Sequence, residues 1–269
     1  MPRKYSFPRR DLSQLAQRLT DRDFDLIGLL GRHRVLTIDQ ITDLLFPTTR
    51  SARERITVLA DLDVVTRWRR SVRPGSQSFR HSLGYTGAYL YAAATGQPEP
   101  RQAVFQRQTA DLIASSTLGH LLGVNAFFAR LTRHARHEAD AEVSEWLNET
   151  EASALTGGLV RPDGAGTFTG PAGTIAFWFE YDNGTETLHR LAGQVERYRT
   201  RLPGLDRALL IELTSTAREA HLHEALAEVR PHFAVATATT DRTEHPAAGV
   251  WRVLHRGGRW PLEQLTSRR

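Results

Sequence analysis

The chain has 269 residues, 40 % of them hydrophobic, and carries a formal net charge of +5. This length and apolar content exclude a disordered chain and allow two domains, each with its own core. The absence of cysteine excludes disulfides and thiolate zinc sites, and no run approaches the roughly 18 apolar residues of a membrane span. We therefore expect a cytoplasmic protein that lacks a signal peptide and does not contact a membrane.

Positive charge is concentrated in the first part of the chain. Residues 1–105 contain 17 Lys and Arg against 10 Asp and Glu, whereas the remainder contains 18 against 20. A cationic first part suits a polyanionic partner. Its opening stretch, PRKYSFPRR, reads either as a basic arm that reaches into a DNA groove or as a frayed terminus without function.

Three helix starts recur in residues 20–66. In each, a hydroxyl residue stands three positions before an acid or amide, the spacing of a capping box. The pairs are Thr20 with Asp23, Thr37 with Gln40 and Ser51 with Glu54. Each start leads into apolar residues at helical spacing. Three short helices with tight connections predict a helix-turn-helix core.

A basic hairpin is expected directly after the third helix. Val64, Val65 and Trp68 form a β-rich run, residues 73–76 form a turn, and the chain returns through Phe79. A hairpin in this place predicts a winged helix. A winged helix also serves as a protein-protein module in some proteins, and this alternative stays open.

The cationic side of this domain is the expected DNA-binding surface. Helical geometry turns Ala52, Ile56 and Leu59 inward, so the opposite side of the third helix would enter the major groove. The hairpin would reach phosphates or a minor groove. The residues predicted to contact double-stranded DNA are Arg50, Ser51, Arg53, Thr57, Arg67, Arg69, Arg70, Arg73 and Arg80.

The Pro- and Gly-rich stretch at 94–102 indicates the end of the first domain. From residue 106 to about residue 137 the apolar spacing predicts one long helix. Its apolar face either packs on the second domain or pairs with its own copy in a homodimer. We therefore expect a winged-helix domain at 1–105, a connecting helix at 106–140 and an α/β domain at 141–269.

The last part alternates between strand and helix patterns, which predicts an α/β layer domain. The expected strands are 143–147, 158–162, 174–181, 207–214, 232–239 and 249–256. The expected helices are 185–202 and 217–231.

Three acids stand at the expected strand ends. Asp163 closes the second strand of this domain, and Glu180 and Asp182 close the third. Carboxylate oxygens in this arrangement would hold Mg²⁺ or Mn²⁺. Alternatively, these residues are ordinary strand-end and turn acids that are compensated by a nearby arginine, for which Arg161, Arg190 and Arg197 are available.

The acids and the following helix resemble the core of the PD-(D/E)XK nuclease fold. In that pattern Asp163 and Glu180 correspond to the metal-binding acids, and QVERY, with Gln194 and Tyr198, is similar to the Gln-x-x-x-Tyr element of some exonuclease branches. The resemblance implies a restriction-endonuclease-like α/β/α domain with a mixed sheet. It also implies a catalytic lysine two residues after the second acid, where this chain has Asp182. If catalysis survives, Gln194 or Arg197 must position the water.

The whole chain resembles the replication-relaxation family of actinobacterial plasmid and integrative-element proteins. The resemblance rests on the helix-turn-helix run from LTDRDFDLIGLL to LADLDVV, on Pro162 with Asp163, and on FWFEYDNGTETLHRLAGQVERY. It implies a role in replication, relaxation or transfer of mobile elements, together with plasmid replication or transfer proteins as partners.

The leading functional hypothesis is a DNA-binding protein of a plasmid or integrative element, in which the nuclease-like domain is degenerate. A second hypothesis is a Mg²⁺- or Mn²⁺-dependent DNA nickase or nuclease that uses Asp163 and Glu180, with Asp182 as an added metal ligand. A third is a transcriptional repressor with a ligand-sensing C-terminal domain.

Overall fold

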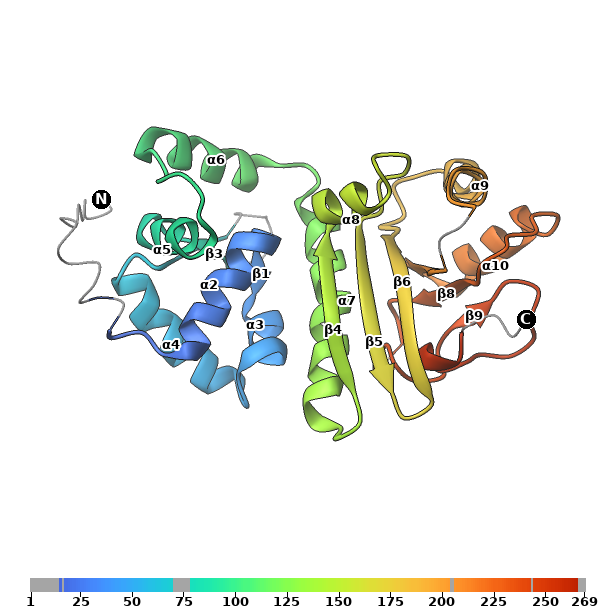
Figure 1. Ribbon diagram of the computed structural model, residues 1–269, viewed down its shortest axis with the longest axis horizontal. Coiled ribbons are helices and arrows are strands. Elements are labelled where there is room, and N and C mark those ends of the chain that lie inside the picture. Colours follow the sequence, from blue (N-terminus) through green and yellow to red (C-terminus); the bar gives the residue numbers. More distant parts are fainter. Residues whose placement is uncertain (1–14, 16, 70–77, 204–205, 243, 266–269) are drawn as a thin grey trace. The chain divides into compact units, whose positions relative to one another are not determined.

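The computed structural model describes residues 15, 17–69, 78–203, 206–242 and 244–265. The chain divides into two compact units, residues 1–118 and residues 119–269, and each is described by itself. Together they make a mixed α/β protein (Figure 1).

Three helices open the described part of the first unit. They are α2 (Asp21–His33), α3 (Ile38–Leu45) and α4 (Thr49–Asp61). The helix starts expected at Thr20 and Thr37 are confirmed and both have capping boxes, with the Thr37 N–H donating to Gln40 Oε1 at 2.9 Å. The third start was wrong by three residues, because Thr48 rather than Ser51 caps α4 and its Oγ1 accepts from the Ser51 N–H.

A three-stranded antiparallel sheet and two further helices complete the first unit. The strands are β1 (Leu36–Thr37), β2 (Val65–Trp68) and β3 (Arg80–Leu83), in the order β1-β3-β2. The helices are α5 (Tyr85–Thr95) and α6 (Gln102–Ala114). Strands β2 and β3 pair in register from Val65 with Leu83 to Trp68 with Arg80. The turn expected at 73–76 and the N-terminal arm lie outside the described residues.

The single helix expected over residues 106–137 is divided into α6 and α7 (Leu118–His137). The break falls at residues 115–117, where Ser115 Oγ accepts from the Thr117 N–H at 3.2 Å and shares a hydrogen bond with the Thr117 hydroxyl. Such local side-chain bonds compete with helical ones, so the helix ends there. The unit boundary, after Leu118, lies next to this break.

The second unit is built around a six-stranded sheet in the order β4-β5-β6-β7-β8-β9. Its strands are β4 (Glu142–Asn148), β5 (Gly164–Gly170), β6 (Gly173–Tyr181), β7 (Ala208–Leu213), β8 (Val235–Thr239) and β9 (Arg252–Val253). Its other elements are α7, α8 (Glu149–Leu155), α9 (Leu188–Arg201), α10 (Thr216–Ala225) and the 3-10 turn η1 (Leu262–Gln264). Strands β6, β7 and β8 are parallel and the other pairs antiparallel, so the sheet is mixed, as expected.

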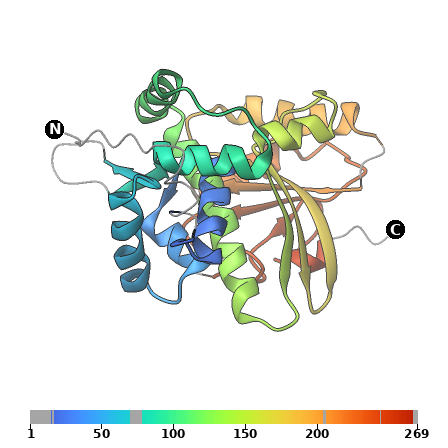
Figure 2. The ribbon, with the colours of Figure 1, turned by 60° about the vertical axis from the view of Figure 1, so that its left-hand side comes forward.

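Helices cover both faces of this sheet (Figure 1). On one face, Phe127 of α7 stacks on Phe179 of β6, with ring centroids 4.0 Å apart. On the other face, Trp178 and Ile211 pack in one core cluster with Val195 of α9. Figure 2 shows the long, twisted β5-β6 hairpin in yellow. Because successive side chains of a strand point to opposite faces of the sheet, alternate residues of β6 pack in the core beneath α7 and in the core beneath α9.

The strand expected at 158–162 was wrong, because these residues form a turn and β5 begins after Asp163. The Thr156 hydroxyl, buried at this turn, donates to the Val160 carbonyl at 2.7 Å. Asp163 therefore precedes a strand and does not close one. No single helix of the described residues is long and apolar enough to cross a membrane, although α6 and α7 reach that length and composition when taken together.

Candidate functional site

The outer side of α4 is a solvent-exposed, cationic surface. Arg50, Arg53 and Thr57 are exposed, whereas Ala52 and Ile56 on the other side are buried in the unit. This is the division that helical periodicity predicted. The surface offers two guanidinium groups and one hydroxyl on a single helix face.

Two of these predicted residues also have local partners. Arg50 is 89 % exposed and pairs with Glu54 one turn later, with Nε and Oε1 at 3.0 Å. An exposed pair of this kind contributes little to stability, so Arg50 can exchange its partner for a phosphate. The Ser51 hydroxyl donates to the Thr48 carbonyl at 2.9 Å, which commits it to the helix start.

The hairpin presents arginines around an exposed aromatic ring. Arg69 and Arg67 lie over the ring of Phe79, with their guanidinium carbons 5.1 Å and 5.6 Å from the ring centroid. Cation–π contacts of this kind hold the side chains extended without neutralising their charge. Arg80 is half-buried and donates to the Ser78 carbonyl at 2.6 Å. The other two predicted hairpin residues, Arg70 and Arg73, lie outside the described residues.

A buried ion pair fixes α4 to α2. Asp23 is 1 % exposed, and its carboxylate receives two hydrogen bonds from Arg55 of α4, one of them at 2.8 Å from Nε. Burial raises the pKa of Asp23, but the hydrogen bonds from Arg55 and Thr20 outweigh it and the pKa is lowered. The periodicity of α4 alone gave no signal for this pair, because its two partners are far apart in the sequence.

In the second unit, Glu180 lies at the end of β6 and is 4 % exposed. The hydroxyl of Tyr198, from α9, donates to Glu180 Oε1 at 2.6 Å. Burial raises the pKa of Glu180 well above its usual value. The charge of Asp163, and the hydrogen bond between Glu180 and Asp163, raise this pKa further. The hydrogen bonds from Tyr198 and Gln194 lower the pKa of Glu180 but do not outweigh these effects. The structure thus brings together Asp163, Glu180, Gln194 and Tyr198.

Two contacts besides the one with Glu180 hold Asp163. The Tyr181 N–H donates to its Oδ2 at 2.8 Å, and His120 Nε2 lies 2.9 Å from its Oδ1. Burial lowers the pKa of His120, but the hydrogen bond and charge of Asp163 outweigh it and raise the pKa above the usual value. This partner was not predicted from the sequence, because the pattern around His120 on α7 fits a surface or core histidine.

Asp182 has a different environment from the other two acids. It is 5 % exposed and pairs with Arg218 of α10, whose Nη2 donates to Oδ1 at 3.0 Å. The Gly184 N–H also donates to Oδ1 at 3.0 Å. The Asp182 carboxylate is therefore compensated by an arginine that the sequence pattern did not indicate.

A cleft of about 410 Å³ opens beside the acid pair. Asp163, Gln194 and Tyr198 line it, together with the three arginines expected as partners of the acids, which are Arg161, Arg190 and Arg197. The Arg161 side chain is 75 % exposed, and its Nη2 lies 3.6 Å from Glu149 Oε1. The Arg190 side chain is 70 % exposed, and its Nη2 lies 3.4 Å from Glu186 Oε1. These arginines face the cleft and are available to an anionic ligand.

The donor set at this cleft suits a hard divalent cation in one specific mode. Among the residues that the structure describes, no three His, Cys, Asp or Glu side chains are grouped to hold a metal ion. Asp163 lines the cleft, and the buried Glu180 beside it would supply a second carboxylate if a bound cation displaced its proton. Mg²⁺ is commonly held by one or two carboxylates with waters and substrate phosphates completing its shell. The protein residues fit that mode and would need the substrate to complete it.

The comparison with protein families gives one match. The family model described as replication-relaxation matches residues 27–203, which is more than half of the chain. The matched stretch begins within α2 and ends just after α9, so it includes α4 and the hairpin. It also includes the four residues that we call the acid cluster, which are Asp163, Glu180, Gln194 and Tyr198. No curated protein and no solved structure matches the chain.

Proposed function

The chain belongs to the replication-relaxation family, and we propose that it serves the replication or relaxation of mobile elements by binding duplex DNA through α4 and the β2-β3 hairpin. In this proposal the first unit is a winged helix. Helix α4 enters the major groove and the hairpin lies on the adjoining backbone.

The observation that carries the proposal is the exposed cationic side of α4. Arg50 and Arg53 project from the helix that follows α2 and α3, which is the place of a recognition helix in a helix-turn-helix core. The opposite side is buried, so the helix can present only this side to a partner. Phosphate contacts from such side chains supply most of the affinity of a small DNA-binding unit.

Two further features support it. The buried pair of Asp23 and Arg55 holds α4 rigidly, which reduces the entropy cost when a helix docks in a groove. On the hairpin, Arg67 and Arg69 are already extended along Phe79. Both features pre-organise positive charge on the same unit.

The test is duplex binding by the full chain, measured by fluorescence anisotropy over a range of salt concentrations. The double variant Arg53→Ala, Arg69→Ala should bind at least about tenfold more weakly, and its salt slope should fall by about 0.9 for each phosphate that an arginine no longer neutralises. The double variant Arg107→Ala, Arg201→Ala changes the net charge equally and removes exposed arginines of α6 and α9. It should bind like the wild type. If both double variants bound DNA equally weakly, the loss of affinity would come from the lower net charge alone, and the proposed surface would be refuted.

The acid cluster supports a second candidate function, a metal-dependent DNA nickase. The specific observation is that Asp163 and Glu180 share one site beside an arginine-lined cleft. A bound Mg²⁺ would activate water and offset charge on the phosphate. Asp163 and Glu180 would hold the ion, Arg197 would bind the phosphate, and Gln194 would orient the water.

This candidate is tested by relaxation of supercoiled plasmid with Mg²⁺ or Mn²⁺. Asp163→Ala and Glu180→Ala should each abolish nicking, whereas Glu244→Gln, at an exposed acid outside the cleft, should leave it unchanged. Identical products from the wild type and both alanine variants would exclude these acids from any cleavage.

A further inference from the structure

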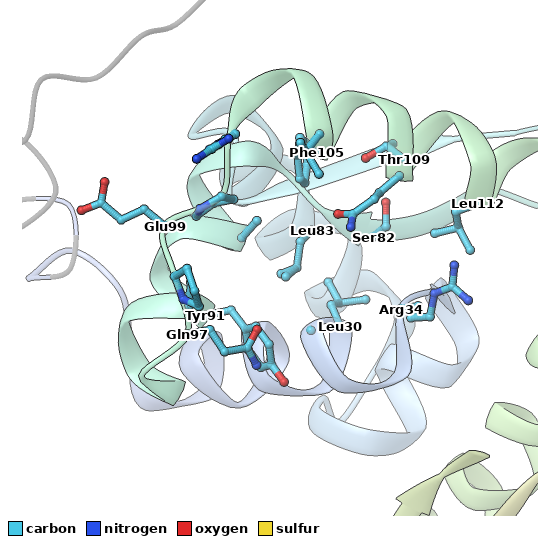
Figure 3. A pocket seen from close by; sticks show the side chains of 18 residues that line it. Leu30, Arg34, Ser82, Leu83, Tyr91, Gln97, Glu99, Phe105, Thr109 and Leu112 are labelled. Carbon is cyan, nitrogen blue, oxygen red and sulfur yellow. The ribbon is translucent and has the colours of Figure 1, made fainter. Parts of the chain in front are cut away.

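The first unit contains a cavity that neither the DNA-binding surface nor the acid cluster uses. Its volume is about 800 Å³, and it lies between α2, β3, α5 and α6. Figure 3 shows Phe105, Thr109 and Leu112 of α6 on one side of the space and Leu30 of α2 on the other, with Leu83 of β3 between them. This volume is within the range of about 300–1,000 Å³ that is typical of small-molecule sites.

The roof of the cavity is held in place from α5. The Tyr85 hydroxyl donates to the Pro100 carbonyl at 2.8 Å, and the Tyr89 hydroxyl donates to Glu99 Oε1 at 2.9 Å. These bonds fix the connection that leads into α6. The helix itself is largely exposed, and Leu112 is its only buried residue. The space beneath α6 is therefore kept open by the connection and is not filled by the helix's own side chains.

The floor is shaped by a glycine. A Cβ atom on Gly31 of α2 would lie 2.4 Å from the ring of Tyr91. Because Gly31 has no side chain, the Tyr91 ring lies flat against α2 and leaves the neighbouring space free. A larger residue at position 31 would force this ring away from the helix.

Arg34 stands at one end of the cavity in an unusual backbone conformation. Its φ of 70° and ψ of −44° resemble a classic γ-turn, and the Val35 N–H donates to the His33 carbonyl across it at 2.8 Å. A non-glycine residue in this region is strained, and such strain often marks a functional position. Within the described part of the chain, no hydrogen bond or ion pair engages the Arg34 guanidinium. The acid of the lining, Glu99, lies at the opposite end (Figure 3).

We propose that this cavity binds an anionic amphipathic small molecule. Its apolar body would lie on Leu30, Leu83 and Leu112, and its carboxylate, sulfonate or phosphate would pair with Arg34. The lining also holds a second guanidinium, that of Arg101, and one acid, Glu99, whose carboxylate accepts a hydrogen bond from Tyr89. A partly apolar wall with this excess of positive charge favours an anionic amphipathic ligand over a neutral or cationic one. The site is separate from the arginines of α4 and the hairpin, so it goes beyond the proposed DNA binding and does not depend on it.

The test is fluorescence titration of the full chain with 1-anilinonaphthalene-8-sulfonate and with N-phenyl-1-naphthylamine, which has the same rings without the sulfonate. Saturable binding of the sulfonate is expected, and Arg34→Gln should weaken it by about tenfold, as expected when a charge-assisted hydrogen bond is removed. The same variant should change binding of the uncharged probe much less.

A second pair of variants locates the probe. Thr109→Trp fills the cavity from α6 and should abolish binding of both probes, whereas Gln106→Trp places the same side chain on an exposed position of that helix and should bind both. Thermal melting without probe checks that all variants are folded. Undiminished sulfonate binding by Arg34→Gln, or equal binding by the two tryptophan variants, would overturn the proposal.

Discussion

Replacing Glu180 by glutamine should make the second unit more stable at alkaline pH and change little at acidic pH. Glu180 is buried beside Asp163 and accepts a hydrogen bond from Tyr198, and its pKa is raised well above the ordinary value of 4.5. A glutamine keeps an oxygen that can accept from Tyr198, but it cannot ionise.

The sign follows from the linkage between protonation and folding. Below the unfolded pKa of 4.5, both folded and unfolded chains hold the proton and the carboxyl costs nothing. As the pH rises above that value, the unfolded chain releases the proton while the folded chain retains it. The free energy of unfolding then falls by up to about 1.4 kcal/mol per pH unit until the folded pKa is reached. Glu180→Gln removes this loss.

The assay is urea unfolding followed by tryptophan fluorescence at several values between about pH 5 and about pH 8. Most tryptophans report on the second unit, namely Trp146, Trp178, Trp251 and Trp260. The variant should match the wild type near the acidic limit and exceed it by about 1.4 kcal/mol or more near the alkaline limit. Glu244→Gln, at an exposed acid, is the control. Parallel pH curves for Glu180→Gln and the wild type would show that Glu180 is ionised in the folded protein and would refute the reasoning.

Two further substitutions test the packing of the sheet in the second unit and the ion pair between α2 and α4 in the first unit. Gly166→Ala should destabilise the second unit by about 1–3 kcal/mol, because its Cβ would lie 2.5 Å from the Phe177 ring; Gly119→Ala, with open space around it, should not, and urea midpoints compare them. Asp23→Ala should cost about 1.5–3 kcal/mol, because Arg55 loses its charge-assisted hydrogen bonds but is 28 % exposed and remains solvated, and DNA affinity measured below the melting temperature should fall with it. Since the pKa of Asp23 is lowered on folding, its contribution is present above pH 3.8 and disappears as the pH falls below that value, so the variant and wild type should converge in acid.

The sequence predicted α2, α3 and α4 well because their signals are local, whereas α5 was not predicted and α6 was merged with α7. The caps at Thr20 and Thr37 and the buried side of α4 follow from spacing alone. The third cap was misplaced because Thr48, Thr49 and Ser51 all carry hydroxyls near the same helix start. Spacing could not decide among them, and Glu54, the expected partner of Ser51, pairs with Arg50.

Tertiary contacts explain what the sequence pattern could not show in the second unit. Strand β5, GAGTFTG, looks like a loop because its glycines break the apolar alternation. At Gly166 the absence of a side chain is required, because the rings of Phe128 and Phe177 occupy the space that a Cβ atom would take. For the same reason the partners of the acids, His120 and Arg218, were not predicted, since they come from helices far away in the sequence.

The position of β7 has a practical consequence for work with fragments. The family match ends at residue 203, before β7. Strand β7 is the parallel neighbour of β6, and β8 is the parallel neighbour of β7. Leu209, Ile211 and Val235 of these two strands belong to the same core cluster as Val195 of α9. A recombinant fragment that ends at residue 203 would leave the backbone edge of β6 unpaired and would expose hydrophobic residues of α9 and β6 that are buried in the whole unit. Such surfaces promote aggregation into inclusion bodies. Expression of the second unit should therefore continue through β9.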